Sequence, residues 1–145
     1  MLAKALVADH VRYLGVPDAI QVASNDPQQI ADSFGGRLGF AAKLPQLSNA
    51  SLLGGRFCWL RGHKALLSFY ESRGKRLSLF VFNPQVLPRA ELRGDQCRSV
   101  GKYQVCLLPH DTELLAMVAD KEEVRAFMHD LTTFQPETQL PHAPN

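Results

Sequence analysis

Three runs with a two-residue period, joined by short turns, constrain this chain more than any other feature. The runs cover residues 56–60, 65–71 and 76–82. The turns between them are Arg61-Gly62-His63 and Ser72-Arg73-Gly74-Lys75. Alternating runs joined by tight turns that contain glycine are typical of β-hairpins. The spacing therefore predicts an antiparallel meander of three strands that begins at about residue 56.

Two more strands are expected further along the chain. Residues 103–108 and 113–119 are strand-like runs, and Pro109-His110-Asp111-Thr112 has turn composition between them. Residues 83–100 are polar and contain prolines, so they are expected to form a long connection. Near the N-terminus, residues 20–23 are a candidate for a further short strand.

Three helices are predicted outside the meander. Apolar residues follow the helical period over residues 2–14. A second helix is expected to begin after Asp26 in the N-cap position and to end at Gly35-Gly36. A third is expected after Asp120, where Glu123 completes a capping box.

These elements predict one α+β domain over residues 1–131, followed by a flexible tail over residues 132–145. The expected architecture is a five-stranded, mostly antiparallel sheet. The N-terminal helices and the C-terminal helix are expected to pack on one face of it. A chain of 145 residues that is 46% apolar and 21% charged is ordinary for one globular core.

The charge balance excludes some classes of partner. The chain has 16 basic and 14 acidic residues, which gives a net charge of +2. This balance gives no reason to expect nucleic acid or an anionic membrane as a partner. No apolar run approaches the roughly 20 residues of a membrane-spanning helix. The N-terminal apolar stretch is also too short and too interrupted for a signal peptide, so no targeting or membrane segment is expected in the chain.

Three ordered segments resemble the extracytoplasmic domain of transmembrane anti-sigma factors. The first is His10-Val11-Arg12-Tyr13-Leu14, and the second is Leu53-Gly54-Gly55-Arg56 with the meander behind it. The third is Gly101-Lys102-Tyr103-Gln104-Val105, followed by residues 115–120 and a closing helix. The likeness covers roughly residues 5–131. The chain departs from the family pattern in lacking its zinc module, His-x3-Cys-x2-Cys, and its membrane helix.

The resemblance implies a non-catalytic sensor or interaction domain on the periplasmic side of the inner membrane. Its expected partner is another envelope protein or a small ligand, and a homodimer is a further expectation. A sigma factor would be bound only through the module that is absent from this sequence. No catalytic residue, cofactor or metal site is expected.

The Gly54-Gly55-Arg56 segment has two interpretations. Two glycines before a strand favour a bulge or a tight strand entry, where backbone approaches closely. The alternative is a backbone anion cradle, but the sequence lacks the Lys-Ser/Thr ending and the helix that such a loop requires. The structural role is therefore the expected one.

The three cysteines leave several alternatives open. Cys58 is expected to be a buried thiol. Cys97 and Cys106 could form a disulfide if the domain is extracytoplasmic, or they could be unrelated thiols. The alternative function is a small-molecule, redox-responsive or metal-responsive binding domain that uses these cysteines. A small cysteine-dependent enzyme is the third hypothesis.

The aromatic residues are expected mainly in the core. The alternative is that the second face of the sheet stays open to a partner or ligand. Four aromatic residues would then form the binding face, namely Trp59, Phe69, Tyr70 and Tyr103.

Overall fold

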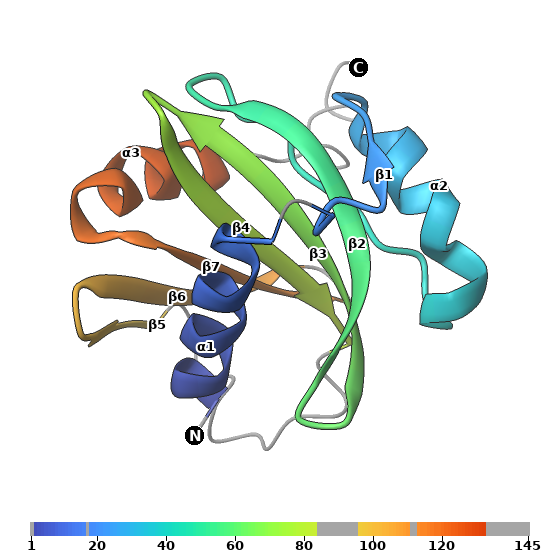
Figure 1. Cartoon of the computed structure of the whole chain (residues 1–145), viewed down its shortest axis with the longest axis horizontal. Coiled ribbons are helices and arrows are strands. Elements are labelled where there is room, and N and C mark those ends of the chain that lie inside the picture. The colour runs from blue at the N-terminus through green and yellow to red at the C-terminus, as the bar shows by residue number, and fades with distance from the viewer. Residues whose placement is uncertain (1, 17, 84–95, 111–112, 133–145) are drawn as a thin grey trace, which may run out of the picture.

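The computed structural model describes residues 2–16, 18–83, 96–110 and 113–132. These residues form one antiparallel sheet of seven strands with three helices (Figure 1). The helices are α1 (Leu2–Leu14), α2 (Pro27–Leu38) and α3 (Lys121–Thr132). The strands are β1 (Val22–Ala23), β2 (Ser51–Leu60), β3 (His63–Ser72), β4 (Lys75–Phe82), β5 (Gln96–Val100), β6 (Tyr103–His110) and β7 (Glu113–Asp120). Their order across the sheet is β1-β2-β3-β4-β7-β6-β5.

The predicted meander is confirmed in strands β2, β3 and β4, which pair in sequence. Both of its turns contain two residues between the paired strands. Arg61 and Gly62 have φ values of 52° and 84°, and Arg73 and Gly74 have values of 53° and 78°. Positive φ at both central residues is the geometry of a type I′ turn, whose twist matches that of the strands it joins.

The sheet has seven strands, so the expectation of five is wrong in this detail. The candidate strand near the N-terminus is present as β1, and it pairs with Gly54 and Gly55 of β2. The second addition is β5, which lies inside the segment expected to be a polar connection. The side chains of Cys97, Arg98 and Ser99 are exposed, and β5 pairs with β6 at the edge of the sheet. An edge strand whose exposed residues are largely polar gives little periodic signal in the sequence.

The helices cover both faces of the sheet, and the expectation that they share one face is wrong. In Figure 1, α1 lies in front of the sheet, whereas α2 and α3 lie behind it. Leu77, Leu79 and Val81 of β4 join the core cluster beneath α2 and α3. Phe80 and Phe82 of the same strand join the cluster beneath α1. Because the central strands are apolar on both sides, a single layer of helices would leave one apolar face in water.

The end of α2 also differs from the prediction. Asp26 caps the helix as expected, because its side chain accepts a 3.0 Å hydrogen bond from the backbone N–H of Gln28. The helix continues through Gly35-Gly36 and ends at Gly39, which has a φ of 79°. Leu38 is buried in the core cluster, so packing of the last turn favours continuation past the two glycines.

The start of α3 is tied to the turn between β3 and β4. Lys75 Nζ lies 3.1 Å from Asp120 Oδ2, and Arg73 Nη2 lies 3.3 Å from both carboxylate oxygens of Glu123. The predicted capping residues Asp120 and Glu123 therefore have ion-pair partners on the neighbouring hairpin. The helix ends at Thr132, one residue past the expected domain boundary at 131, and the rest of the expected tail lies outside the described residues. None of the helices described is long and apolar enough to cross a membrane.

Candidate functional site

The layer between α1 and the sheet contains a buried polar pair and a partly buried arginine. This helix buries Leu2, Leu6 and His10, which are spaced four residues apart along one side of it. It packs against β5, β6 and β7. The polar side chains of His10, Ser78 and Arg76 therefore meet in the layer between this helix and the sheet.

His10 and Ser78 form a buried polar pair. The Nδ1 atom of His10 lies 2.7 Å from Ser78 Oγ, and the two residues are 2% and 1% exposed. The imidazole ring also meets the ring of Tyr103 edge-on, with 5.1 Å between centroids. Burial lowers the pKa of His10 to about 4; Asp120 opposes this shift, while Arg76 and Lys102 add to it. At neutral pH the pair is uncharged.

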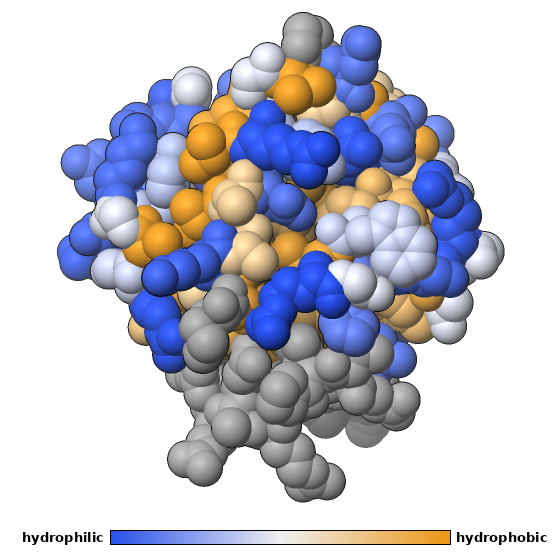
Figure 2. Space-filling view, turned by 60° about the horizontal axis from the view of Figure 1, so that its bottom comes forward, coloured by the Kyte–Doolittle hydropathy of each residue, from blue (hydrophilic) through white to orange (hydrophobic). Residues whose placement is uncertain are grey.

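A cavity of about 260 Å³ opens beside the C-terminal end of α1. Its lining side chains are aliphatic apart from one guanidinium group, and polar atoms make up at least as much of its surface as apolar atoms. The lining residues are Leu14, Gly15, Val16, Ala19, Ile20 and Arg76. Leu14 and Val16 are also exposed to solvent, at 43% and 42%. Apolar side chains among hydrophilic ones at the molecular surface are visible in Figure 2.

Among the described residues that line this cavity, Arg76 is the only charged one. Its Nε atom is buried and has no hydrogen-bond partner. Its guanidinium lies 5.4 Å from the centre of the Phe69 ring. Among the described residues no ion pair of Arg76 is found, although Glu71 stands opposite it in the register of β3 and β4. A buried donor without a partner is rare in native proteins. This Nε is closed to solvent, so a ligand can reach Arg76 only through the exposed part of its side chain.

Arg56 holds the wall of the cavity in place. Its Nη1 atom donates a 3.0 Å hydrogen bond to the carbonyl oxygen of Ala19, which lines the cavity. Its guanidinium also lies 4.4 Å from the centre of the Tyr13 ring. The backbone N–H of Gln21 donates to Gly55 O at 3.0 Å, which fixes the next part of the loop. Arg56 therefore ties Ala19 and Tyr13 to β2.

Gly54 and Gly55 lie at a bulge in β2 and permit close packing. The register between β2 and β3 shifts between Leu52 and Gly54, and Gly54 has a φ of 154°. A Cβ atom on Gly54 would collide with the carbonyl oxygen of Val22 in β1. A Cβ atom on Gly55 would lie 2.8 Å from Cγ2 of Ile30 in α2. The expected bulge is present, although the two glycines lie inside β2 and not before the strand.

The four aromatic residues proposed as a binding face do not form one surface. Phe69 and Tyr70 are each 1% exposed and belong to the core clusters on opposite faces of the sheet. The hydroxyl of Tyr70 donates a 2.7 Å hydrogen bond to Pro45 O. Tyr103 is half-buried beside His10, and only Trp59 is largely exposed, at 59%. The open-face alternative is therefore wrong for Phe69 and Tyr70, because helices cover both faces.

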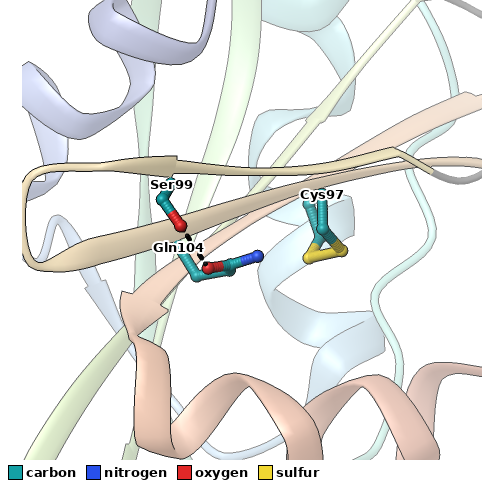
Figure 3. The surroundings of a disulfide bond; sticks show 4 residues. Cys97, Ser99 and Gln104 are labelled. Carbon is teal, nitrogen blue, oxygen red and sulfur yellow. Dashed lines mark hydrogen bonds between the residues drawn. A yellow bond between two sulfur atoms is a disulfide. The ribbon is translucent and has the colours of Figure 1, made fainter.

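Cys97 and Cys106 are joined by a disulfide bond (Figure 3). The two residues stand directly opposite each other in β5 and β6. Cys106 is fully buried in the cluster beneath α2 and α3, whereas Cys97 is exposed. Next to the bond, Ser99 Oγ donates a 3.0 Å hydrogen bond to Gln104 Oε1.

Cys58 is a buried free thiol. Burial raises its pKa to about 12, with a smaller contribution from Asp9, so it is protonated at neutral pH. Within the described ranges, no group of three or more histidine, cysteine or acidic residues is placed to hold a metal ion.

The sequence reasoning missed Arg76 and the pairing of His10 with Ser78. A signal was present, because Arg76 and Ser78 alternate with Leu77 and Leu79 in β4 and so share one face. His10 likewise continues the spacing of Leu2 and Leu6 in α1. The partners could not be predicted, because nothing in the sequence shows which face of the sheet α1 covers.

The geometry places the Arg76 side chain among aliphatic residues that line a cavity, on the same face of the sheet as the neutral His10–Ser78 pair. Such a cavity can bind a small anionic molecule, and the buried pair holds α1 against β4. No family model, curated protein or solved structure was found to match this chain.

Proposed function

We propose that this chain is a non-catalytic sensing or interaction domain that works outside the cytoplasm, like the extracytoplasmic domain of a membrane-bound anti-sigma factor. The observation that carries this proposal is the disulfide between Cys97 and Cys106. Disulfides persist in oxidising compartments and are rare in the cytosol. The bond therefore favours the location that the resemblance implies. Binding to a sigma factor would require a separate module.

The state of the cysteines argues against a cysteine-dependent enzyme. A thiolate is the nucleophile in such enzymes, and its formation requires a lowered pKa or an adjacent base. Cys58 is buried and its pKa is raised, while Cys97 and Cys106 are bonded to each other. Each of the three side chains is thus held in an unreactive form, which supports a binding role.

Recognition of a small molecule is the mode of sensing that the structure favours. The cavity at the end of α1 combines aliphatic side chains with the charged side chain of Arg76. Binding sites for small molecules typically join an apolar lining with a few polar groups that fix orientation. A partner protein or a second copy remains the alternative, for which the exposed Trp59 on β2 is the available contact.

The location can be tested by counting thiols. The chain would be produced with and without an added signal peptide, and free thiols would be measured in denaturant before and after reduction. We expect the exported protein to show one free thiol, from Cys58, and three after reduction. A Cys97→Ser/Cys106→Ser variant is the control that shows one thiol in both states. Three thiols in exported wild-type protein before reduction would contradict the proposed location.

The sensing role requires a separate test. The domain would replace the extracytoplasmic part of a membrane-anchored anti-sigma regulator in a bacterial reporter strain. We expect the reporter output to change when envelope stresses or small solutes are applied, and to stay constant when the domain is deleted from the chimera. The same output from both chimeras across the whole panel would count against a sensor.

A further inference from the structure

We propose that the cavity beside α1 binds a small monocarboxylate with an apolar tail, whose carboxylate contacts Arg76. The tail would lie against Leu14, Val16, Ala19 and Ile20. This inference rests on the proposed sensing function and names the ligand class of that site. The chemistry corresponds to a medium-chain fatty acid or a similar amphiphilic acid.

The charge of the cavity selects an anion. Arg76 supplies the only charge among the lining residues that the structure describes, and its buried Nε lacks a hydrogen-bond acceptor. A carboxylate suits the exposed part of Arg76, because its oxygens accept charge-assisted hydrogen bonds from the N–H groups of a guanidinium. The nearby Arg56 is already bonded to Ala19 O and shapes the wall.

A single guanidinium also favours a singly charged ligand. A carboxylate carries one negative charge, which the charge of Arg76 balances. A phosphate dianion would bring a second charge into a cavity where no other lining residue is charged. Burial of a charge without a partner is strongly unfavourable. An alkyl phosphate is therefore expected to bind more weakly than the carboxylate with the same tail.

The aliphatic lining side chains and the size of the cavity select the rest of the ligand. Apart from Arg76, the lining residues carry no polar side chain. The volume of about 260 Å³ lies just below the range of roughly 300–1,000 Å³ that is typical for drug-sized ligands. A short unbranched hydrocarbon tail fits this space, and its transfer from water is favourable.

The experiment is a titration of the full ¹⁵N-labelled chain with octanoate, followed by NMR. The reporting signals are the backbone amides of Val16 and Ile20 and the side-chain Nε–H of Arg76. We expect saturable shifts at these three positions. Three control compounds should each bind more weakly than octanoate. Sodium acetate lacks the tail, 1-octanol lacks the charge, and octyl phosphate carries a larger charge.

Two variants and a control locate the binding. Arg76→Met should weaken octanoate binding by about tenfold or more, because it removes a charge-assisted hydrogen bond. Val16→Glu places a carboxylate at an exposed cavity residue and should weaken binding similarly with little effect on folding. Arg98→Met removes an exposed charge from β5, away from the cavity lining, and should leave the affinity unchanged.

Several outcomes would overturn the proposal. The first two are equal affinity for octanoate and 1-octanol, and tighter binding of octyl phosphate than of octanoate. The others are wild-type affinity for octanoate in a folded Arg76→Met or Val16→Glu variant, and NMR shifts spread over the whole molecule. If octanoate does not bind while the chimera still responds to a stress, the ligand class is wrong and the sensing role stands. If octanoate binds but no chimera responds to it or to any stress, the cavity assignment stands and the sensing role fails.

Discussion

At the level of single residues, His10 connects α1 to two strands of the sheet. Its Nδ1 atom is hydrogen-bonded to Ser78 in β4, and its ring packs on Tyr103 in β6. A charged imidazole at this position would lose its hydration and would lie near Arg76 and Lys102. The fold therefore requires neutral histidine, and this requirement makes the stability of the protein depend on pH.

We expect stability to fall as the pH is lowered from about 6.5 to about 4. The folded-state pKa of His10 lies near 4, whereas the unfolded value is near 6.5. In this window the unfolded chain binds a proton that the folded chain does not, so protonation favours unfolding. The loss at the acid end is on the order of 3 kcal/mol. Urea unfolding at a series of pH values would measure it.

The His10→Gln variant isolates this contribution. Glutamine keeps a hydrogen-bonding group near Ser78 but does not titrate, so the pH dependence in this window should become shallower. Burial raises the pKa of Asp9, so Asp9 changes the stability with pH in the opposite direction to His10. Asp9 is present in both proteins, so its effect cancels when the two are compared. His63→Gln is the matched control. An unchanged slope in His10→Gln would show that His10 is not the titrating group.

At the scale of elements, the glycines of β2 make the sharpest prediction. Gly54→Ala should destabilise the protein by about 2 kcal/mol, because the added Cβ collides with the backbone of β1 at a positive φ. Gly36→Ala is the control, since Gly36 lies in α2 with open space around it. That change should instead stabilise by about 0.5–1 kcal/mol. Equilibrium unfolding of both variants is the measurement, and equal effects would contradict the role given to Gly54.

The same elements show what the sequence could predict. Glycine turns and two-residue periodicity are local signals, so the meander and the capped start of α2 were predictable. The strand β5 was missed because its residues are largely polar and its order comes from pairing with β6. The end of α2 was missed because burial of Leu38 outweighs the two glycines. Placement of α1 opposite α2 and α3 depends on packing between distant segments. The position of Arg76 in the cavity follows from that placement, so it could not be predicted from the sequence.

At the scale of the whole molecule, the sheet is a central layer with helices on both sides. Nearly every residue of the central strands β3, β4 and β7 is buried, apart from the strand ends. This is expected for a sheet that has helices on both faces. At the β5 edge the sheet ends in a hairpin that carries the disulfide on one face, while α1 packs on the other face. The stability of this edge should therefore affect the α1 layer, which includes the Arg76 cavity.

Removal of the disulfide tests this arrangement. In the chain-entropy picture, a bond between residues nine apart contributes roughly 2–3 kcal/mol. A Cys97→Ala/Cys106→Ala variant, and wild-type protein kept reduced, should both lose about that much unfolding free energy in urea. Because β5 pairs only with β6, amide exchange should accelerate more in β5, β6 and α1 than in the β2–β3 hairpin. Uniform acceleration across the sheet, or no loss of stability, would show that the disulfide does not act through this edge.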